Sequence, residues 1–253
     1  MKRFLSLLLT LLLLAGCLAA GTFSSFVGAE PQLTDEEILS QRRDIAEAYM
    51  RKMTSVIWRA EEDLVYTTAS GDYAHPLDAE AAGKKVFHVY AGELYRGMPY
   101  SYAGSDYGSF MDYCSEPDEN EIYHVSGLTW EALSGNSTCA PRIGNDCSGA
   151  LMRAYSQIGN SFMFTTTPYM TEDRGYLRVG DYTSPTDQNY QTTEVCKSNG
   201  QQTMFEAYAQ LQKADAIVDY YSTGGHTRMV VSVKVVRNAD GTINGSRSNI
   251  TVL

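Results

Sequence analysis

The sequence is short of positive charge, of histidine and of metal-binding patterns. It carries 20 Lys and Arg residues against 30 Asp and Glu residues, which gives a formal net charge of −10. A chain this acidic is not attracted at long range to nucleic acid or to anionic lipid, so we expect neither as a partner. The sequence has no His-x-x-x-His pair, no Cys-x-x-Cys pair and no internal repeat. It therefore predicts no metal site and no repeat architecture.

Residues 1–29 have the composition of an export signal. A short basic start, Lys2 and Arg3, precedes an almost wholly apolar stretch over residues 4–15. Small residues before Glu30 fit an ordinary signal-peptidase site. We therefore expect cleavage after Ala29 and a protein that is secreted or lies in the cell envelope.

The sequence also allows a second position for the end of the export signal. Residues 14–17 (LAGC) fit a bacterial lipobox, which would put a lipid on Cys17 and anchor the protein. Residues 18–29 remain small and apolar, unlike a polar tether, and this favours cleavage after Ala29. A lipid on Cys17 is the only membrane contact that the sequence predicts.

Residues 30–85 predict a helical extension followed by a linker. Thr34 and Glu37 form a capping box at the start of a helix. Apolar residues recur at helical spacing through about Ala60, at Ile38, Ile45, Tyr49, Met53, Val56 and Ile57. Residues 66–85 contain turn-forming residues and are expected to connect this helix to the next domain.

Residues 144–149 (GNDCSG) predict a turn followed by the start of a helix. Asp146 is a good N-cap, and Gly159 is a plausible helix end. The helix is amphipathic, with one face made of Cys147, Leu151, Ala154, Tyr155 and Ile158. A thiol at the first helical position lies at the positive end of the helix dipole, which favours the nucleophilic thiolate. We therefore predict that Cys147 is a catalytic nucleophile.

A nucleophilic thiol needs a base, and the chain has four histidines. His226 begins the most strand-like run in the sequence, residues 226–236. A thiol at a helix start and an imidazole at the start of a later strand form the papain-like arrangement, in which the two meet only on folding. Strand alternation, however, puts His226 on the face opposite Met229. For His226 to face the cysteine helix, the strand would need a bulge, or it would need to be an edge that lines the cleft.

Three segments of this chain resemble motifs of the NlpC-type cell-wall cysteine peptidases, in the family's order: residues 96–104 (RGMPYSYAG), residues 146–149 (DCSG), and residues 213–217 (KADAI) with 225–226 (GH). The first segment is similar to the family's Gly-x-Pro-Tyr-x-Trp-Gly-Gly pattern, with Tyr102 in place of Trp and Ala103 in place of Gly. The resemblance covers residues 86–253.

This resemblance implies an α+β, papain-like fold, with the nucleophile helix packed on an antiparallel sheet after an N-terminal helical extension. It implies a secreted peptidase that hydrolyses amide bonds of peptidoglycan stem peptides and needs no cofactor. Cys147 and His226 would be catalytic. Tyr100, Asp146 and Ser148 would bind the free amine or an amide of the substrate. A papain-like amidase or acyltransferase, or an inactive binding module of the same fold, stay open as alternatives.

The family takes a third catalytic residue from the strand after the histidine strand. A hairpin turn predicted at residues 238–241 (NADG) places the partner of His226 near residue 253 or later. We therefore expect this third residue beyond Leu253, in a sequence that is truncated at its C-terminus.

Two long insertions flank the predicted catalytic helix, at residues 105–143 and at about 160–200. They are expected to reshape substrate choice, and the three cysteines they contain leave all pairings open: Cys114, Cys139 and Cys196. Outside them, the sequence predicts helices over 86–95 and 201–213 and a strand over 216–221.

Overall fold

The computed structural model describes residues 33–63, 65–67, 85–86, 89–101, 103–132, 138–159, 167–184, 190–222 and 224–253. The chain divides into two units, Met1–Glu36 and Glu37–Leu253, and the elements below belong to the second apart from the first two residues of the first helix. The predicted export signal, Cys17 and Tyr102 lie outside the described residues. Within the described part, no helix combines the length and the apolar character needed to cross a membrane.

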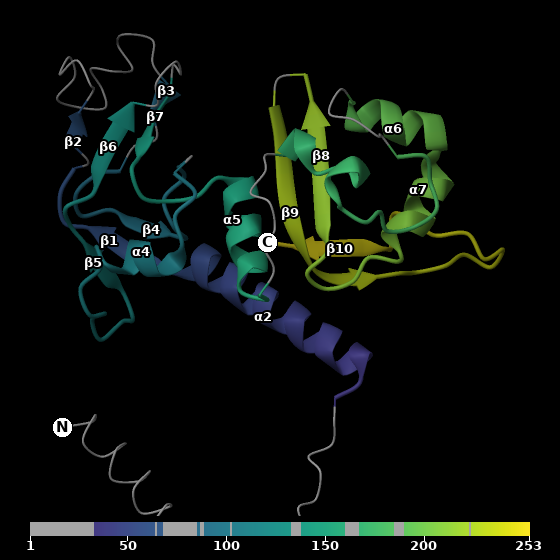
Figure 1. The fold of residues 1–253 in the computed structure, drawn as a ribbon, viewed down its shortest axis with the longest axis horizontal. Coiled ribbons are helices and arrows are strands. Elements are labelled where there is room, and N and C mark those ends of the chain that lie inside the picture. Colours follow the sequence, from purple (N-terminus) through teal and green to yellow (C-terminus); the bar gives the residue numbers. More distant parts are fainter. Residues whose placement is uncertain are drawn as a thin grey trace, which may run out of the picture. The chain divides into compact units, whose positions relative to one another are not determined.

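The described residues form a mixed α+β structure, which confirms the predicted class (Figure 1). Its α-helices are α2 (Asp35–Ser55), α4 (Tyr107–Met111), α5 (Cys147–Ser156), α6 (Thr192–Asn199) and α7 (Gln201–Tyr208), with short 3₁₀ helices η1 (Thr167–Tyr169) and η2 (Glu172–Arg174). Its strands are β1 (Ile57–Ala60), β2 (Val65–Thr67), β3 (Lys85–Val86), β4 (Leu94–Arg96), β5 (Tyr123–Val125), β6 (Thr129–Ala132), β7 (Thr138–Pro141), β8 (Ala216–Tyr221), β9 (Gly224–Lys234) and β10 (Asn249–Val252).

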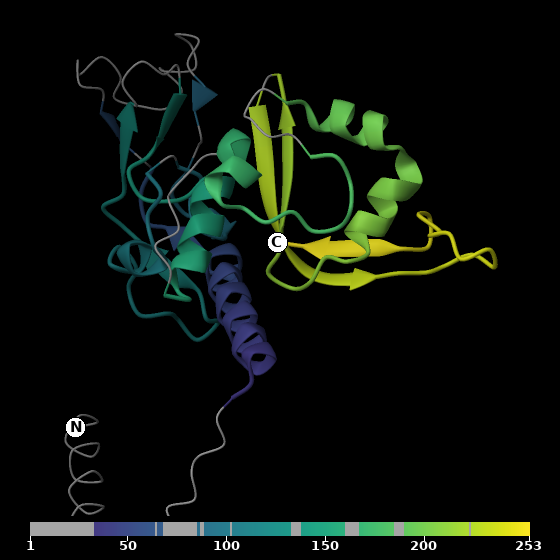
Figure 2. The same cartoon turned by 45° about the vertical axis from the view of Figure 1, so that its right-hand side comes forward.

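The strands form three small sheets. In the first, β1 lies between β4, to which it is antiparallel, and β5, to which it is parallel. The second has the order β10-β9-β8 and is antiparallel throughout. The third has the order β2-β6-β7-β3. Helix α5 packs against β9, and the two run side by side in both views (Figures 1 and 2). The predicted nucleophile helix therefore packs on an antiparallel sheet.

The first helix is shorter than predicted. The pattern correctly predicts α2, but residues 57–60 form strand β1 rather than the last turn of the helix. Successive β-branched residues, Val56 and Ile57, favour extended backbone there. Trp58 then pairs with Tyr95 of β4 on one side and with Tyr123 of β5 on the other. Tertiary pairing thus overrides the helical spacing of the apolar residues.

The helix predicted over residues 86–95 is wrong. Residues 91–92 form a turn, in which Gly92 has φ +79°, and strand β4 follows. The turn is held by the Gly92 N–H, which donates to the Ala60 carbonyl at 2.7 Å. Since β4 hydrogen-bonds to β1, the first sheet joins residues on both sides of the predicted domain boundary at residue 85.

The first predicted insertion, residues 105–143, has structure of its own, since it supplies α4, β5, β6 and β7. Part of it packs against Trp58, which is 1% exposed and donates its indole N–H to the Gly97 carbonyl at 2.8 Å. The Trp58 ring stacks on the Tyr95 ring, with 4.7 Å between the ring centroids, and makes an edge contact with the Phe110 ring, with 5.7 Å between the centroids. The core around this ring consists of Val56, Ala60, Val89, Phe110, Val125 and Leu128. The insertion thus completes a hydrophobic core rather than forming a bare loop.

A second core joins α2, α5 and the antiparallel sheet. Its fully buried members include Ala46 of α2, Leu151 and Ala154 of α5, and Met229 of β9. Ala216 and Val218 of β8 pack against the same cluster. This core fixes the face of the sheet on which helix α5 lies.

The C-terminal part agrees closely with the sequence pattern. The strand predicted over 216–221 is confirmed as β8, and the helix predicted over 201–213 is confirmed in part as α7. The predicted turn at residues 238–241 is present, with the Gly241 N–H donating to the Asn238 carbonyl at 3.0 Å. Helix α6, in the second predicted insertion, was not expected from the sequence.

Trp58→Ala should destabilise the protein by about 3–5 kcal/mol, because it removes a buried ring and leaves a cavity between β1 and the insertion. Chemical denaturation measures this loss. Leu94→Ala, at a position of β4 that is 53% exposed, is the matched control and should change stability by less than about 0.5 kcal/mol. Equal stability of the two variants would contradict the role given to Trp58.

Candidate active site at the start of helix α5

Helix α5 begins at Cys147 because Asp146 caps it. Asp146 has extended backbone, and its Oδ1 accepts hydrogen bonds from the Gly149 N–H at 2.6 Å and from the Ser148 hydroxyl at 3.1 Å. The first of these satisfies an N–H group that a helix start leaves unpaired. The predicted cap is confirmed. Ser148 is only 2% exposed, so in this structure its hydroxyl supports the cap and is not open to a ligand.

The segment that contains Tyr100 lies alongside the residues that precede Cys147. The Asn145 N–H donates to the Pro99 carbonyl at 3.0 Å, and the Ser101 N–H donates to the Asn145 carbonyl at 3.1 Å. These bonds form a parallel bridge between Tyr100 and Asn145. Tyr100 is 42% exposed. Two segments singled out in the sequence are thus joined by backbone hydrogen bonds at the start of the helix.

Gly144 makes this approach sterically possible. Its φ is +146°, and a Cβ atom at this position would lie 2.1 Å from the Pro99 carbonyl oxygen. No other residue fits such a contact without moving the backbone. Asn145 locks the same region, since its Nδ2 donates to the Ser105 carbonyl at 2.5 Å while the residue is 8% exposed. Nothing in the sequence pattern marks Asn145, although it directly precedes the cap.

The Cys147 thiol is partly buried and contacts a threonine hydroxyl. Its Sγ lies 3.9 Å from Thr167 Oγ1, and no other side-chain hydrogen bond of this sulfur occurs among the described residues. Thr167 belongs to η1 and is 4% exposed. Its methyl carbon sits 2.8 Å from where a Cβ on Gly225 would be. Thr167 therefore links Cys147 to the residue just before His226, a link for which the sequence offered no signal.

His226 lies on the other face of the β8–β9 hairpin. It pairs with Asp219 of β8 in a regular antiparallel register. Opposite residues of a pair share a face, and alternate residues share a face, so His226 lies with Asp219 and Arg228. Gly225, next to Thr167, and Met229, in the core with α5, lie on the opposite face.

The structure thus brings Cys147 close to the strand of His226 but does not join the two side chains. No hydrogen bond between them occurs in the described part of the chain. The bulge that could turn His226 toward the helix is not at that end of the strand. The register between β9 and β10 shifts at Thr251 and Val252, opposite residues 230–232 of β9.

Burial lowers the pKa of His226, and the charge of Arg228 lowers it further, while Asp219 opposes them. The imidazole is therefore neutral at neutral pH, which is the form that accepts a proton. Asp219 is the residue directly opposite His226 in the β8–β9 register. Strand β10 reaches the position opposite Val230, and the third catalytic residue expected beyond Leu253 stays a prediction.

The described thiols are free. Cys114, Cys147 and Cys196 form no disulfide, so none of the three pairings left open by the sequence is present, since each includes Cys114 or Cys196. Burial raises the pKa of Cys114 to about 11, which makes it a poor nucleophile. Within the same described residues, no three His, Cys, Asp or Glu side chains are grouped so that they could hold a metal ion.

Thr167→Val should slow the alkylation of Cys147 by iodoacetamide about fivefold, because it removes a hydroxyl that can donate to the thiolate, an interaction of about 1 kcal/mol. Peptide mass mapping follows Cys147 separately from the other thiols. Thr167→Ser keeps the hydroxyl and should restore the wild-type rate. The same rate in Thr167→Val as in the wild type would show that the 3.9 Å contact does not act on the sulfur.

Comparison with protein-family models, with curated proteins and with solved structures gave no match for this chain. The motif resemblance and the geometry around Cys147 are therefore the grounds on which a function can be proposed.

Proposed function

We propose that this protein is an exported cysteine peptidase of the papain-like, NlpC type, which hydrolyses amide bonds of peptidoglycan stem peptides in the cell envelope. One observation carries the proposal: the Tyr100 segment, the Cys147 helix and the strand of His226 meet around the start of α5, the last of them through Thr167. These three segments are far apart in the sequence. Their convergence is what a thiol hydrolase of this architecture requires.

In the proposed reaction, the Cys147 sulfur attacks the carbonyl carbon of the scissile amide. The start of α5 supplies free backbone N–H groups, among them that of Cys147, which can stabilise the negative oxygen of the tetrahedral intermediate. The amine then leaves with a proton, and the acyl group stays on sulfur as a thioester. Water hydrolyses the thioester and returns the thiol. No cofactor takes part in these steps.

His226 is the proposed proton carrier. Its neutral imidazole takes the thiol proton and later gives it to the leaving amine. To do so, the ring must turn from the face of Asp219 past the edge of the strand. Gly224 and Gly225 flank that edge without side chains, and Gly225 is the residue in contact with Thr167. The proposal thus includes a change of His226 conformation when substrate binds.

Tyr100 and Asp146 are the proposed contacts to the free amine or an amide of the substrate, with Ser148 as a buried support for Asp146. Tyr100 is the exposed member of the three. The Asp146 carboxylate supplies negative charge beside the thiol, although it also holds the helix cap. An ammonium group bound near Tyr100 would be attracted by this charge, and Ser148 would act through its hydrogen bond to Asp146.

Cys147→Ala and His226→Ala should each reduce the release of new amino groups from purified peptidoglycan at least about a thousandfold, because nucleophile and base act as one unit. Mass spectrometry of the released peptides gives the rate and the bond cleaved. Cys196→Ser and His124→Ala change the same residue types elsewhere and should leave the rate unchanged. Full activity in Cys147→Ala would refute the proposal.

A binding module without catalysis is the second candidate. It is favoured by one observation: His226 shares a face with Asp219 rather than with the α5 helix. In that case wild-type protein would bind peptidoglycan and release no amine. An amidase or acyltransferase using the same pair would instead release amine from other amides, or transfer the acyl group to an added amine.

In a plot of kcat/KM against pH, the midpoint of the acidic limb should lie below the ordinary histidine pKa of about 6.5. The reason is that burial and Arg228 lower the pKa of His226. Activity is lost as the pH falls through this pKa, since a protonated imidazole cannot accept the thiol proton. Arg228→Gln should move the limb to higher pH and Asp219→Asn to lower pH. A limb that moves in neither variant would show that another group controls it.

A further inference from the structure

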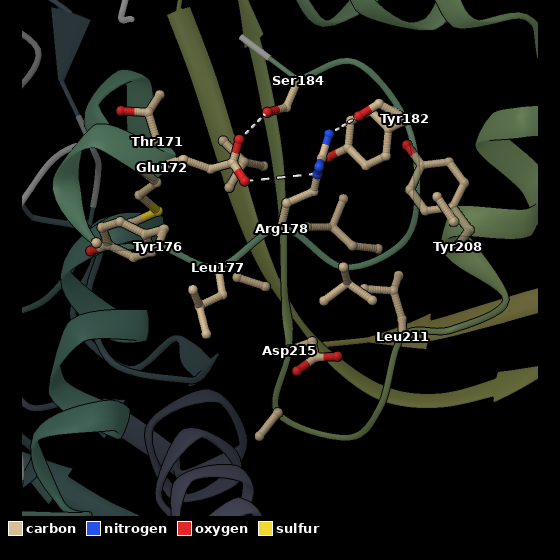
Figure 3. Close-up of a pocket in the computed structure, with 18 of the residues that line it drawn as sticks. Thr171, Glu172, Tyr176, Leu177, Arg178, Tyr182, Ser184, Tyr208, Leu211 and Asp215 are labelled. Atoms are coloured by element: carbon tan, nitrogen blue, oxygen red, sulfur yellow. Dashed lines mark hydrogen bonds and ion pairs between the residues drawn. The ribbon is translucent and has the colours of Figure 1, made fainter. Parts of the chain in front are cut away.

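A cavity of about 490 Å³ lies at the other end of helix α5 from the thiol. It is lined by residues of α2, by the C-terminal part of α5, by residues 170–184, by α6 and α7, and by the start of β8. Figure 3 shows part of this lining, with residues between Thr171 and Ser184 facing Tyr208 and Leu211. Neither Cys147 nor His226 lines it. Its volume is in the range of sites for small organic ligands. The proposed peptidase reaction assigns no role to it.

The walls of the cavity are largely apolar. They include Leu39, Ile158, Val179, Leu211, Ile217 and Val218. Leu177 also lines the cavity and is 93% exposed, so it forms part of the rim (Figure 3). An exposed leucine at the rim of an apolar cavity favours a ligand whose main part is apolar.

Three tyrosines add polar atoms to these walls. The hydroxyls of Tyr182, Tyr190 and Tyr208 make no hydrogen bond to any residue that the structure describes. Burial raises the pKa of all three, that of Tyr190 to about 12. They are protonated at neutral pH and can each donate to an acceptor on a ligand.

The charges around the cavity do not cancel. Asp215 is paired with Arg43 at 2.6 Å, and Glu172 lies 3.7 Å from Arg178. Arg42, which precedes Arg43 in α2, also lines the cavity and has no ion pair within the described part of the chain. Among the described residues that line the cavity, Arg42 is thus a cation without an ion pair, in a chain whose net charge is −10.

We propose that this cavity binds an amphiphilic acid: an apolar chain or ring body inside the cavity, and a single anionic group beside Arg42. The apolar walls exclude a highly charged ligand, and the lone Arg42 favours one negative charge over none. The tyrosine hydroxyls accommodate a polar atom on an otherwise apolar body.

Two fluorescent probes with the same ring system test the proposal on the intact chain. 1-Anilinonaphthalene-8-sulfonate carries one negative charge, and N-phenyl-1-naphthylamine carries none. We expect both to bind saturably, and the anion to bind more tightly. Arg42→Gln should weaken the binding of the anionic probe about threefold, because it removes one exposed ion pair between probe and protein. It should leave the binding of the neutral probe unchanged. Lys52→Gln removes one charge from the same helix at a residue that does not line the cavity, and it should change the affinity of neither probe.

A rim variant locates the bound probe. Leu177→Glu, at a residue too exposed to disturb folding, should weaken both probes roughly fivefold, through lost apolar contact and an added negative charge. Leu94→Glu, also at an exposed leucine but away from the cavity, should weaken neither. Absence of saturable binding would overturn the proposal, as would equal effects of the variants and their controls. These readouts do not depend on peptidase activity, and Cys147→Ala should bind both probes like the wild type.

Discussion

The arrangement around the candidate thiol depends on a short backbone contact between residues 99–101 and residues 144–145. Two hydrogen bonds to Asn145 hold these segments together, and Gly144 permits the approach because a Cβ atom there would overlap the Pro99 carbonyl. The contact fixes where the chain enters α5 and therefore where Cys147 stands. The Asp146 cap then fixes the first helical turn. The same two bonds place Tyr100 opposite Asn145, two residues before Cys147.

The β8–β9 hairpin imposes a second constraint. One face packs on α5 through Met229, and through Gly225 it meets Thr167, which contacts the sulfur. The other face carries His226 beside Asp219. Strand alternation separates the imidazole from the thiol unless the strand edge rearranges. The glycines before His226 are the part of the strand where such a rearrangement costs least, since they have no side chains to repack.

Helix α5 has a distinct site at each end. Its first residue is the candidate nucleophile, and Tyr155 and Ile158, near its other end, line an apolar cavity. The helix spans about 15 Å, so a ligand in the cavity does not touch the thiol. The shared helix nevertheless makes both sites depend on the same core, which includes Leu151, Ala154 and Met229. The Asp146 carboxylate at the start of the helix and Arg42 at the cavity put charges of opposite sign near the two sites.

Features that depend on local chemistry could be predicted from the order of residues alone. The Asp146 cap, helix α5 starting at Cys147, strand β8 and the turn before β10 all follow from capping, spacing and turn residues. Tertiary structure decided what local patterns leave ambiguous. Residues 57–60 and 94–96 have patterns compatible with helix, and only pairing around Trp58 makes them strands. The contact of Thr167 with Cys147 and the face of His226 result from long-range packing and register, because side chains distant in sequence become neighbours only when the sheet and helix pack together.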